Sequence, residues 1–384
     1  MAGQSLTVER VEVAFGPVEV LKGVSLTVAP GELVALLGSS GCGKTTLLRA
    51  ISGFVPVRGG RVLAGERNIT GLPPEKRGMA MVFQSYALWP HMSTAQNIAY
   101  GLRLRGAPRA KRAARVREVL ALLGLEGLGE RPVTQLSGGQ RQRVALGRAL
   151  AVNPGILLLD EPLSNLDARI RQSVRHEIKA LQGQLGITAI HVTHDREEAM
   201  VLADRIAIME AGQIVQLGPP EEVYNRPASP FVAAFMGADN EIRLRVQSDG
   251  RTVRVAAGEH HEEAILPFGA RAGEDGVHLA GAADGEALAH FRSEAARLIG
   301  EGETVPDSLI LRGRIALASY PGGFYRYAVE VGKRRFMVDD QRRRNAGDPV
   351  GVCLPAAALH FYPDRENLPG STSETGARTE AGEP

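Results

Sequence analysis

Apolar and polar residues alternate at the start of the chain. Residues 6–13 and 18–28 alternate in the way of half-buried strands, on either side of Gly16-Pro17. Residues 56–71 contain Gly59-Gly60 and Gly65 and have the pattern of a hairpin. The pattern therefore predicts an antiparallel β region near the N-terminus.

Four apolar runs further on, at residues 33–37, 79–83, 155–159 and 188–192, have the pattern of buried strands in a parallel sheet. Helical patterns lie between them, among them a long amphipathic stretch that ends at Leu185. Parallel strands bring the residues at their C-terminal ends to one edge of the sheet, where ligands bind. We therefore expect an α/β core whose site residues follow these runs.

Residues 86–136 have a helical pattern and are interpreted as a helical subdomain inserted into the core. Their basic segment, residues 103–117, favours a solvated helix face, with binding to a membrane surface or a protein groove as the alternative. Trp89 is the only tryptophan, and it can serve either as core filler or as an interface anchor.

A glycine-rich loop follows the run at 33–37 and precedes a helix-forming stretch. It fits the pattern G-x-x-x-x-G-K-[ST], in which backbone N–H groups surround phosphate oxygens at a helix N-terminus. Lys44 is expected to reach the β and γ phosphates of a nucleotide, and the Thr45 hydroxyl to bind Mg²⁺. An ordinary glycine-rich turn is the alternative. The loop comprises Gly38, Ser39, Ser40, Gly41, Cys42, Gly43, Lys44, Thr45 and Thr46.

Four polar positions at strand ends are candidates for phosphate chemistry. Gln84 is a candidate Mg²⁺ or water contact, and His194 a candidate donor to the γ phosphate. Asp160 can hold Mg²⁺ through water, and Glu161 can orient or deprotonate the attacking water. If each strand is considered alone, Asp160 and Glu161 can equally be solvated acids and His194 a structural histidine. The phosphate loop upstream favours the catalytic roles.

Two further groups complete the candidate site. Ser137 is the expected N-cap of a helix, and its turn, with Gly138, Gly139 and Gln140, offers a second set of N–H groups to an anion. Near the N-terminus, Phe15 can stack on a base with Val20 beside it, or it can be a core or turn aromatic.

Length and composition narrow the class of protein. The 384 residues favour two domains, and 45 Lys and Arg against 43 Asp and Glu disfavour nucleic acid as a partner. The two cysteines, Cys42 and Cys353, form no disulfide or zinc pattern and indicate a reducing cytosol. No run approaches the length of about 20 apolar residues that a membrane-spanning helix needs, and the N-terminus lacks the pattern of a signal peptide. If the protein acts at a membrane, we therefore expect it to bind there as a peripheral subunit.

Taken in order, these motifs resemble the ATP-binding cassette of ABC transporters over residues 1–240. The matching segments are the phosphate loop (Walker A), Gln84 (Q-loop), residues 136–140 (signature), Asp160 with Glu161 (Walker B), residues 164–167 (D-loop) and His194 (switch). Residues 86–92 and 218–224 resemble importers of sugars, polyamines, ferric iron and phosphonates. The resemblance implies an α/β P-loop NTPase fold with a RecA-like core, an antiparallel β subdomain and a helical subdomain.

The resemblance also implies partners. Two copies are expected to form a head-to-tail homodimer, in which residues 137–140 of one copy contact ATP held by the other, and Asp167 is counted with the ATP-binding residues. Closure on ATP and reopening after hydrolysis would drive two integral-membrane permease subunits, served by an extracytoplasmic solute-binding protein. The implied location is the cytoplasmic face of the inner membrane. The solute stays open among polyamine, aminoethylphosphonate, ferric iron and sugar.

Short β-like runs continue at residues 243–246, 252–255, 315–331 and 350–354. They resemble the all-β, OB-like TOBE domain that follows the cassette in such importers, so a second domain is expected over residues 241–363. Within it, residues 286–298 have a helical pattern instead of the segment that the resemblance leads us to expect. Residues 364–384 are polar and aromatic-free, which predicts a disordered tail.

The motifs favour an energy-coupling ATPase of an ABC importer over two rivals. One rival is a soluble ABC ATPase of DNA repair or translation, a class that usually has two cassettes, zinc-binding cysteines or a basic arm, whereas this chain has one Walker A loop. The other rival is a nucleotide-binding regulatory module without turnover, which the presence of both Glu161 and His194 disfavours.

Overall fold

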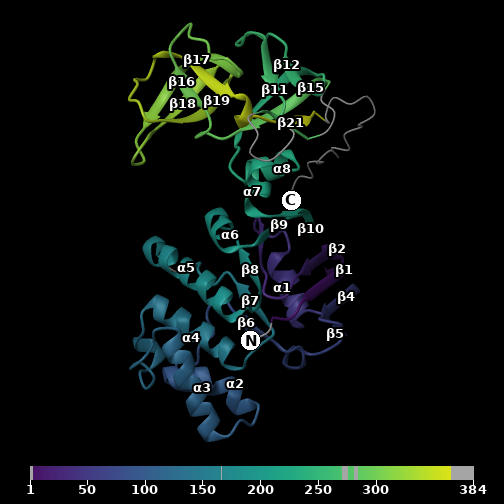
Figure 1. Cartoon of the computed structure of the whole chain (residues 1–384), viewed down its shortest axis with the longest axis vertical. Coiled ribbons are helices and arrows are strands. Elements are labelled where there is room, and N and C mark those ends of the chain that lie inside the picture. Colours follow the sequence, from purple (N-terminus) through teal and green to yellow (C-terminus); the bar gives the residue numbers. More distant parts are fainter. Residues whose placement is uncertain (1–2, 166, 270–275, 281–283, 365–384) are drawn as a thin grey trace, which may run out of the picture. The chain divides into compact units, whose positions relative to one another are not determined.

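The computed structural model describes residues 3–165, 167–269, 276–280 and 284–364. The chain divides into two compact units, Met1–Val223 and Tyr224–Pro384 (Figure 1). The sequence pattern places the boundary at residue 240 instead. Residues between the two positions pack on the second unit, where Ala233 and Ala238 share a small core with Tyr362, whose hydroxyl donates to the Pro227 carbonyl at 2.9 Å.

The first unit begins with the predicted antiparallel sheet, in the order β2-β1-β4-β5. Alternate residues of its two long strands are buried, and this period of two turns one face of the sheet towards the core. Side chains of that face pack against helix α1 (Lys44–Ser52), which also contacts the inner strands of the second sheet. The strands are β1 (Leu6–Phe15), β2 (Val18–Val28), β4 (Gly59–Ala64) and β5 (Arg67–Asn68).

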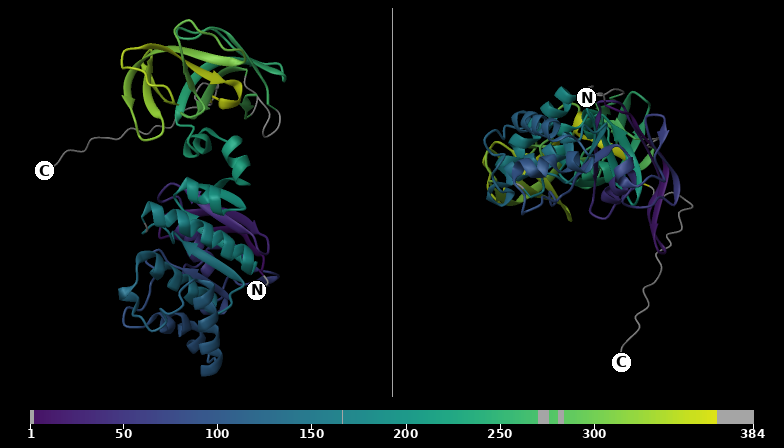
Figure 2. Two further views of the ribbon diagram at one scale, coloured as in Figure 1. Left: turned by 60° about the vertical axis from the view of Figure 1, so that its left-hand side comes forward. Right: turned by 90° about the horizontal axis from the view of Figure 1, so that it is seen from below.

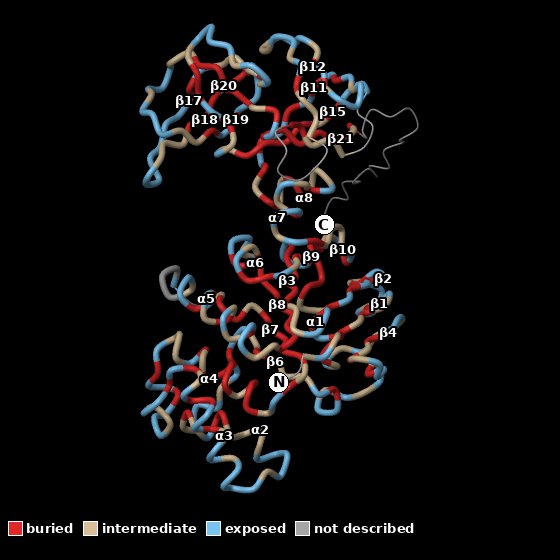
Figure 3. The backbone as a smooth tube through the Cα atoms, viewed as in Figure 1, coloured by how far each residue is buried: buried red, intermediate tan, exposed pale blue. Residues whose placement is uncertain are grey.

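The central sheet has the order β10-β9-β3-β8-β7-β6 and is parallel except for the β9–β10 pair. Every residue of β3, β7 and β8 is buried (Figure 3), as their unbroken apolar runs predict. The strands are β3 (Leu33–Gly38), β6 (Met79–Val82), β7 (Ile156–Asp160), β8 (Thr188–Thr193), β9 (Arg205–Glu210) and β10 (Gln213–Gly218).

Helices surround this sheet, and three of them gather at one end of the first unit (Figure 1, Figure 2). This group is α2 (Thr94–Leu104), α3 (Arg109–Leu122) and α4 (Gly138–Ala151), so residues 86–136 contain helices as their pattern predicts. The other helices of the first unit are α1 (Lys44–Ser52), α5 (Ala168–Leu185) and α6 (Arg196–Leu202). Helix α7 (Pro220–Asn225) contains the boundary between the units, and α8 (Pro230–Phe235) belongs to the second unit. The basic side chains of α3 are largely solvated, and Trp89 is 42% exposed against Tyr100, which excludes a role as core filler.

Arg77 closes the C-terminal end of α1. Its guanidinium is buried and donates to four backbone carbonyls at 2.6–2.8 Å, those of Ala50, Ile51, Thr70 and Leu72. Two of these carbonyls belong to the last turn of α1, where the Ala50 carbonyl also accepts from the N–H of the C-cap residue Gly53 at 3.2 Å. Arg77 therefore joins α1 to the turn after the β4–β5 hairpin.

Replacing Arg77 with Ala is expected to lower the free energy of unfolding by about 3 kcal/mol, because several carbonyls lose a charged donor in a buried place. Urea unfolding of the full chain measures this change. The matched control is Arg61→Ala, which breaks the exposed ion pair with Glu9 and should cost less than about 1 kcal/mol. Equal losses for the two variants would contradict the role given to Arg77.

The second unit is built from two sheets around one core, in the orders β13-β12-β11-β15-β21-β14 and β16-β20-β17-β18-β19. Phe291, Tyr327, Phe336 and Phe361 are among its largest fully buried side chains. The first sheet holds β11 (Asn240–Ser248), β12 (Thr252–Val255), β13 (Ala264–Pro267), β14 (His278–Leu279), β15 (Gly285–Phe291) and β21 (His360–Pro363). The other holds β16 (Arg297–Ile299), β17 (Ser308–Ser319), β18 (Tyr325–Val331), β19 (Arg334–Asp340) and β20 (Pro349–Pro355).

The helix predicted over residues 286–298 is wrong, because this segment forms β15 and the start of β16. β15 pairs with β11 on one side and β21 on the other, and Ala287 and Ala289 face the core with no exposed surface. Tertiary pairing thus overrides a helical preference that rests on small, helix-forming residues. Asp364, predicted to be disordered, is buried and forms an ion pair with Arg243, whereas residues 365–384 lie outside the described residues.

His360 makes the second unit sensitive to acid. Burial, followed by the positive charge of the nearby Arg292 and by His278 and His290, lowers its pKa to about 3. The folded state therefore stays neutral at His360 while the unfolded chain takes up a proton below its ordinary pKa of 6.5. Stability contributed by neutral His360 is complete above pH 6.5 and is lost progressively as the pH falls towards 3.

Between pH 7 and pH 5, the free energy of unfolding is expected to drop by about 2 kcal/mol through this group. Urea unfolding of the full chain, followed through tyrosine fluorescence at several pH values, measures the slope. The variant His360→Gln keeps an acceptor for Arg292 but does not titrate, so its slope should be shallower. The same slope in both proteins would contradict the assignment.

Candidate functional site

The predicted strand-end residues meet at one edge of the central sheet. Strands β3, β8, β7 and β6 are neighbours in that order and run parallel, so their C-terminal ends share this edge (Figure 1). β3 leads into the phosphate loop, β7 into Glu161 and β8 into His194, while Gln84 follows β6. Sequence order and strand order differ, and the sheet brings distant segments together.

The phosphate loop wraps around the ammonium group of Lys44. Its Nζ donates to the carbonyls of Gly38 and Ser39, each at 2.8 Å, and the side chain is buried. Gly43 has φ of 106°, and a Cβ on it would lie 2.9 Å from Leu21 Cδ2. A glycine is therefore required where the loop enters α1, both by the backbone conformation and by the close approach of β2.

Thr45 and Asp160 place a hydroxyl and a carboxylate next to each other at the end of the phosphate loop. The Thr45 hydroxyl donates to Asp160 Oδ1 at 3.2 Å. Burial raises the pKa of Asp160, the Thr45 hydrogen bond and Arg49 oppose the rise, and Glu161 adds to it. Hydroxyl and carboxylate oxygens suit a hard cation such as Mg²⁺. Within the described residues there is no cluster of three His, Cys, Asp or Glu side chains that could hold a metal.

Glu161 is the meeting point of the predicted catalytic residues. Its Oε2 accepts a hydrogen bond from Gln84 Nε2 at 3.2 Å and lies 3.3 Å from His194 Nδ1. Glu161 has φ of 43°, held by its N–H to the Val192 carbonyl and by its own carbonyl, which accepts from Ser164. This conformation is uncommon for a residue other than glycine. At the end of β7 it directs the Glu161 side chain towards Gln84 and His194.

Two residues that sequence reasoning did not assign to the site hold the Gln84 loop in place. Asn165 Nδ2 donates to the Gln84 carbonyl at 2.8 Å. Arg148 on α4 donates to the carbonyls of Tyr86 and Ala87 at 2.7 and 2.5 Å, and both of those residues have positive φ. Burial lowers the pKa of Arg148. No sequence signal identifies these contacts, because the partners are backbone carbonyls far away in the chain.

The turn at residues 137–140 lies apart from this site. Ser137 and Gln140 form a capping box, in which Ser137 Oγ accepts from the Gln140 N–H at 3.3 Å and Gln140 Oε1 accepts from the Ser137 N–H at 3.0 Å. Ser137 is exposed. Across the described part of the chain, no hydrogen bond or ion pair joins this turn to the phosphate loop. The turn is thus formed but faces solvent.

Phe15, Val20 and Asp167 also reach the surface. Phe15 is 54% exposed, so it is not a core aromatic, and it pairs in register with exposed Val18. Strand β2 lies next to the phosphate loop at Val20, because a Cβ added to Gly43 would be 3.2 Å from the Val20 carbonyl oxygen. Asp167 is exposed directly before α5, and its carbonyl accepts from the Arg171 N–H at 2.9 Å.

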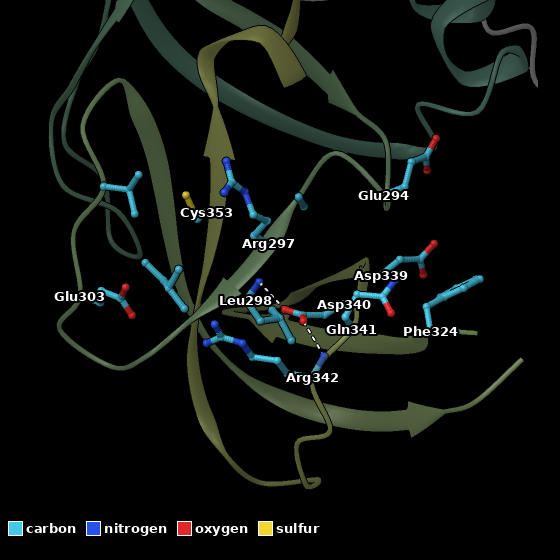
Figure 4. Close-up of a pocket in the computed structure, with 13 residues that line it drawn as sticks. Glu294, Arg297, Leu298, Glu303, Phe324, Asp339, Asp340, Gln341, Arg342 and Cys353 are labelled. Atoms are coloured by element: carbon cyan, nitrogen blue, oxygen red, sulfur yellow. Dashed lines mark hydrogen bonds between the residues drawn. The ribbon is translucent and has the colours of Figure 1, made fainter. Parts of the chain in front are cut away.

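The second unit contains a cavity of about 560 Å³ that sequence reasoning did not anticipate (Figure 4). Asp340 lines the cavity and accepts hydrogen bonds from the Leu298 and Arg342 N–H groups at 3.1 and 2.8 Å. Cys353 lies at its wall as a buried free thiol. Of the helices among the described residues, none combines the length and the apolar character needed to cross a bilayer.

Comparison with known proteins identifies two family models. The one described as ABC transporter matches residues 21–164, and the one described as TOBE domain matches residues 289–361. The first match spans the phosphate loop, the capped turn and Glu161, and the second covers strands β16 to β20 with parts of β15 and β21.

Individual relatives match over longer stretches. The Fe(3+) ions import ATP-binding protein FbpC of Agrobacterium fabrum is 44% identical over 355 residues, which are 91% of this chain and 95% of the relative. FbpC 1 of Rhizobium meliloti is 52% identical over 64% of this chain and 70% of the relative. The sn-glycerol-3-phosphate import ATP-binding protein UgpC of Jannaschia sp. is 48% identical over 72% of this chain and 77% of the relative.

Proposed function

Because the chain belongs to the ATP-binding proteins of ABC importers, we propose how its own residues bind and hydrolyse ATP to energise uptake. The chain is the ATP-hydrolysing subunit and works with membrane permease components. The observation that carries the detailed proposal is the contact of Glu161 with both Gln84 and His194 beside the phosphate loop.

The phosphates of ATP bind in the loop of residues 38–46. N–H groups of the loop and of the first turn of α1 surround the phosphate oxygens, and the Lys44 ammonium turns from the loop carbonyls to the β and γ phosphates. Thr45, Asp160 and Gln84 would hold Mg²⁺, which when bound neutralises charge on the phosphate oxygens. The base stacks on Phe15 beside Val20.

Glu161 orients the attacking water and accepts its proton. The positive φ of Glu161 directs the carboxylate towards Gln84 and His194. Gln84 holds the carboxylate in position, and His194 donates a hydrogen bond to the γ phosphate. Phosphoryl transfer needs positioning and charge compensation more than covalent help, and these three side chains supply both.

A second copy of the chain completes the site. The exposed turn of Ser137, Gly138, Gly139 and Gln140 offers N–H groups to the γ phosphate of ATP held by the other copy, with Asp167 at the same interface. ATP thus favours the closed head-to-tail homodimer, and hydrolysis removes the shared charge and reopens it. Two permease subunits at the cytoplasmic face of the inner membrane convert this cycle into transport, with solute from an extracytoplasmic binding protein.

Relatives of similar identity are named for import of Fe(3+) ions and of sn-glycerol 3-phosphate. An ATP-binding chain of this kind serves importers of unlike solutes, so we assign the choice of solute to the permease and the binding protein. Reconstitution of the chain with a permease encoded beside its own gene tests the proposal. A loaded binding protein should stimulate ATP hydrolysis in wild type and not in Lys44→Ala. Equal ATP hydrolysis by the two proteins would contradict it.

Replacing Phe15 with Ala is expected to weaken ATP binding about tenfold, because the loss of base stacking costs about 1.4 kcal/mol. Phe15→Trp should keep the affinity, since tryptophan also stacks. Phe54→Ala is the matched control, because Phe54 is exposed to the same 54% but lies against Phe83. Fluorescent-nucleotide titration measures the three affinities, and an unchanged value for Phe15→Ala would exclude the stacking role.

A further inference from the structure

His194 lies between two residues whose side chains are fixed. The Thr193 hydroxyl is buried and donates to the carboxylate of Glu198. The Asp195 N–H donates to Thr193 Oγ1 at 3.0 Å, and Asp195 Oδ1 accepts from the Glu198 N–H at 3.1 Å as the N-cap of α6. The backbone on both sides of His194 is therefore held, while its own side chain is 59% exposed.

Glu198, which accepts a hydrogen bond from the Thr193 hydroxyl, belongs to a buried pair with His191. Glu198 Oε1 lies 2.9 Å from His191 Nε2, and His191 has no exposed surface. Burial on its own would raise the pKa of Glu198, but hydrogen bonds from His191 and Thr193 outweigh burial and lower it. Glu198 therefore stays ionised and anchors Thr193.

Asp195, the residue that follows His194, is bound to helix α5. Asp195 Oδ2 accepts from Arg175 at 2.7 Å and from Arg171 at 3.4 Å, and the Arg175 side chain is only 6% exposed. Burial would raise the pKa of Asp195, but the Glu198 N–H and the two arginines lower it. Helix α5 starts directly after Asp167. Two ionic contacts, the shorter of them from Arg175, thus join the helix that follows Asp167 to the residue that follows His194.

We propose that Arg175 and Asp195 are a positioning pair that holds His194 against Glu161 and ties its position to helix α5. The proposal rests on the proposed role of His194 in hydrolysis. The pair does not touch nucleotide or reacting atoms. A shift of α5 moves Asp195, and Asp195 moves the backbone of its neighbour His194. Displacement of His194 by about 1 Å is enough to slow a phosphoryl transfer that depends on positioning.

The test uses the full chain and measures steady-state ATP hydrolysis with Asp195→Asn, Arg175→Met and the double variant. Asparagine is as good an N-cap as aspartate, so Asp195→Asn removes the charge and leaves the cap of α6. Each single variant should lower kcat about 10- to 100-fold with KM within twofold of wild type. The double variant should lose less activity than the product of the two single effects, because both changes break the Arg175–Asp195 contact. Each change also affects one contact of its own, that of Asp195 with Arg171 and that of Arg175 with Glu197.

The matched control is Lys179→Met, which breaks a 2.6 Å ion pair from the same helix to Asp204, away from His194. Its kcat should stay within twofold of wild type. Arg175→Lys keeps a cation and should retain more activity than Arg175→Met, and thermal melting with ATP titration identifies any variant that does not fold. If Arg175→Met unfolds, the comparison of Arg175→Lys with wild type still decides. Arg175 contacts Asp195 through Nη2 and Glu197 through Nη1. The single ammonium group of a lysine cannot replace both nitrogens, so Arg175→Lys should lower kcat without changing KM.

Three results would overturn the inference. They are a normal kcat in folded Asp195→Asn, additive effects in the double variant, and a loss in Lys179→Met as large as that in Arg175→Met. Failure of the proposed function has a different signature, namely His194→Ala or Glu161→Gln hydrolysing ATP at the wild-type rate. Normal Asp195→Asn together with inactive His194→Ala would reject the positioning pair alone.

Discussion

Glu161→Gln is expected to bind ATP with wild-type affinity and to hydrolyse it at least about 10³-fold more slowly. Glutamine has the same shape and can keep hydrogen bonds to Gln84 and His194, but it cannot accept a proton from water. The first unit should keep its fold, since the positive φ of Glu161 is held by backbone contacts to Val192 and Ser164 that the substitution does not touch. ATP should then accumulate uncleaved and hold two copies together.

Single-turnover hydrolysis and light scattering of the ATP-bound protein measure both consequences. Glu177→Gln is the control, because Glu177 is a carboxylate on α5 that pairs with Arg143 at 2.6 Å and is no part of the site. Its turnover should equal that of wild type. Near-normal turnover in Glu161→Gln would reject the role of Glu161 as the base.

Ser137→Arg is expected to abolish ATP-dependent dimerisation and turnover while the monomer still binds ATP. Among the described residues, the exposed turn at Ser137 shares no hydrogen bond or ion pair with the phosphate loop, and in the proposed function it meets the ATP held by a second copy. A long cationic side chain there would fill the space that the γ phosphate of ATP held by the other copy has to occupy. The substitution also removes the cap of α4, which costs about 1 kcal/mol.

Ser137→Ala separates these two effects, because it removes the cap without adding bulk. Dimerisation should be weakened modestly in Ser137→Ala and lost in Ser137→Arg. Gel filtration with ATP and nucleotide titration of the monomer give the two readouts. If Ser137→Arg lost monomer affinity to the extent of Lys44→Ala, the turn would belong to the ATP site of its own chain.

Much of the first unit could be predicted because its signals are local. Unbroken apolar runs such as Leu33–Gly38 can be buried on both faces only in an inner strand, and that burial is observed. The meeting of Gln84, Glu161 and His194 follows from placing each after such a strand. The capping box is likewise local, because Ser137 and Gln140 are only three residues apart in the chain.

The misjudged features depend on contacts between distant segments. Residues 286–298 are rich in helix formers, but strands β11 and β21 on either side decide their conformation. Arg148 and Asn165 act on backbone carbonyls, which have no sequence signature. Asp364 reads as part of a polar tail, and only its pairing with Arg243 places it in the second unit.

The central claim is that each ATP site is shared by two copies of the chain. The direct measurement is light scattering, with ATP, of two variants in the Glu161→Gln background, one carrying Lys44→Ala and the other Ser137→Arg. Either variant alone should be monomeric, and their mixture should form heterodimers with one bound ATP, because only that pairing combines an intact phosphate loop with an intact turn. A mixture that stays monomeric, or Ser137→Arg alone dimerising as well as its parent, would contradict the claim.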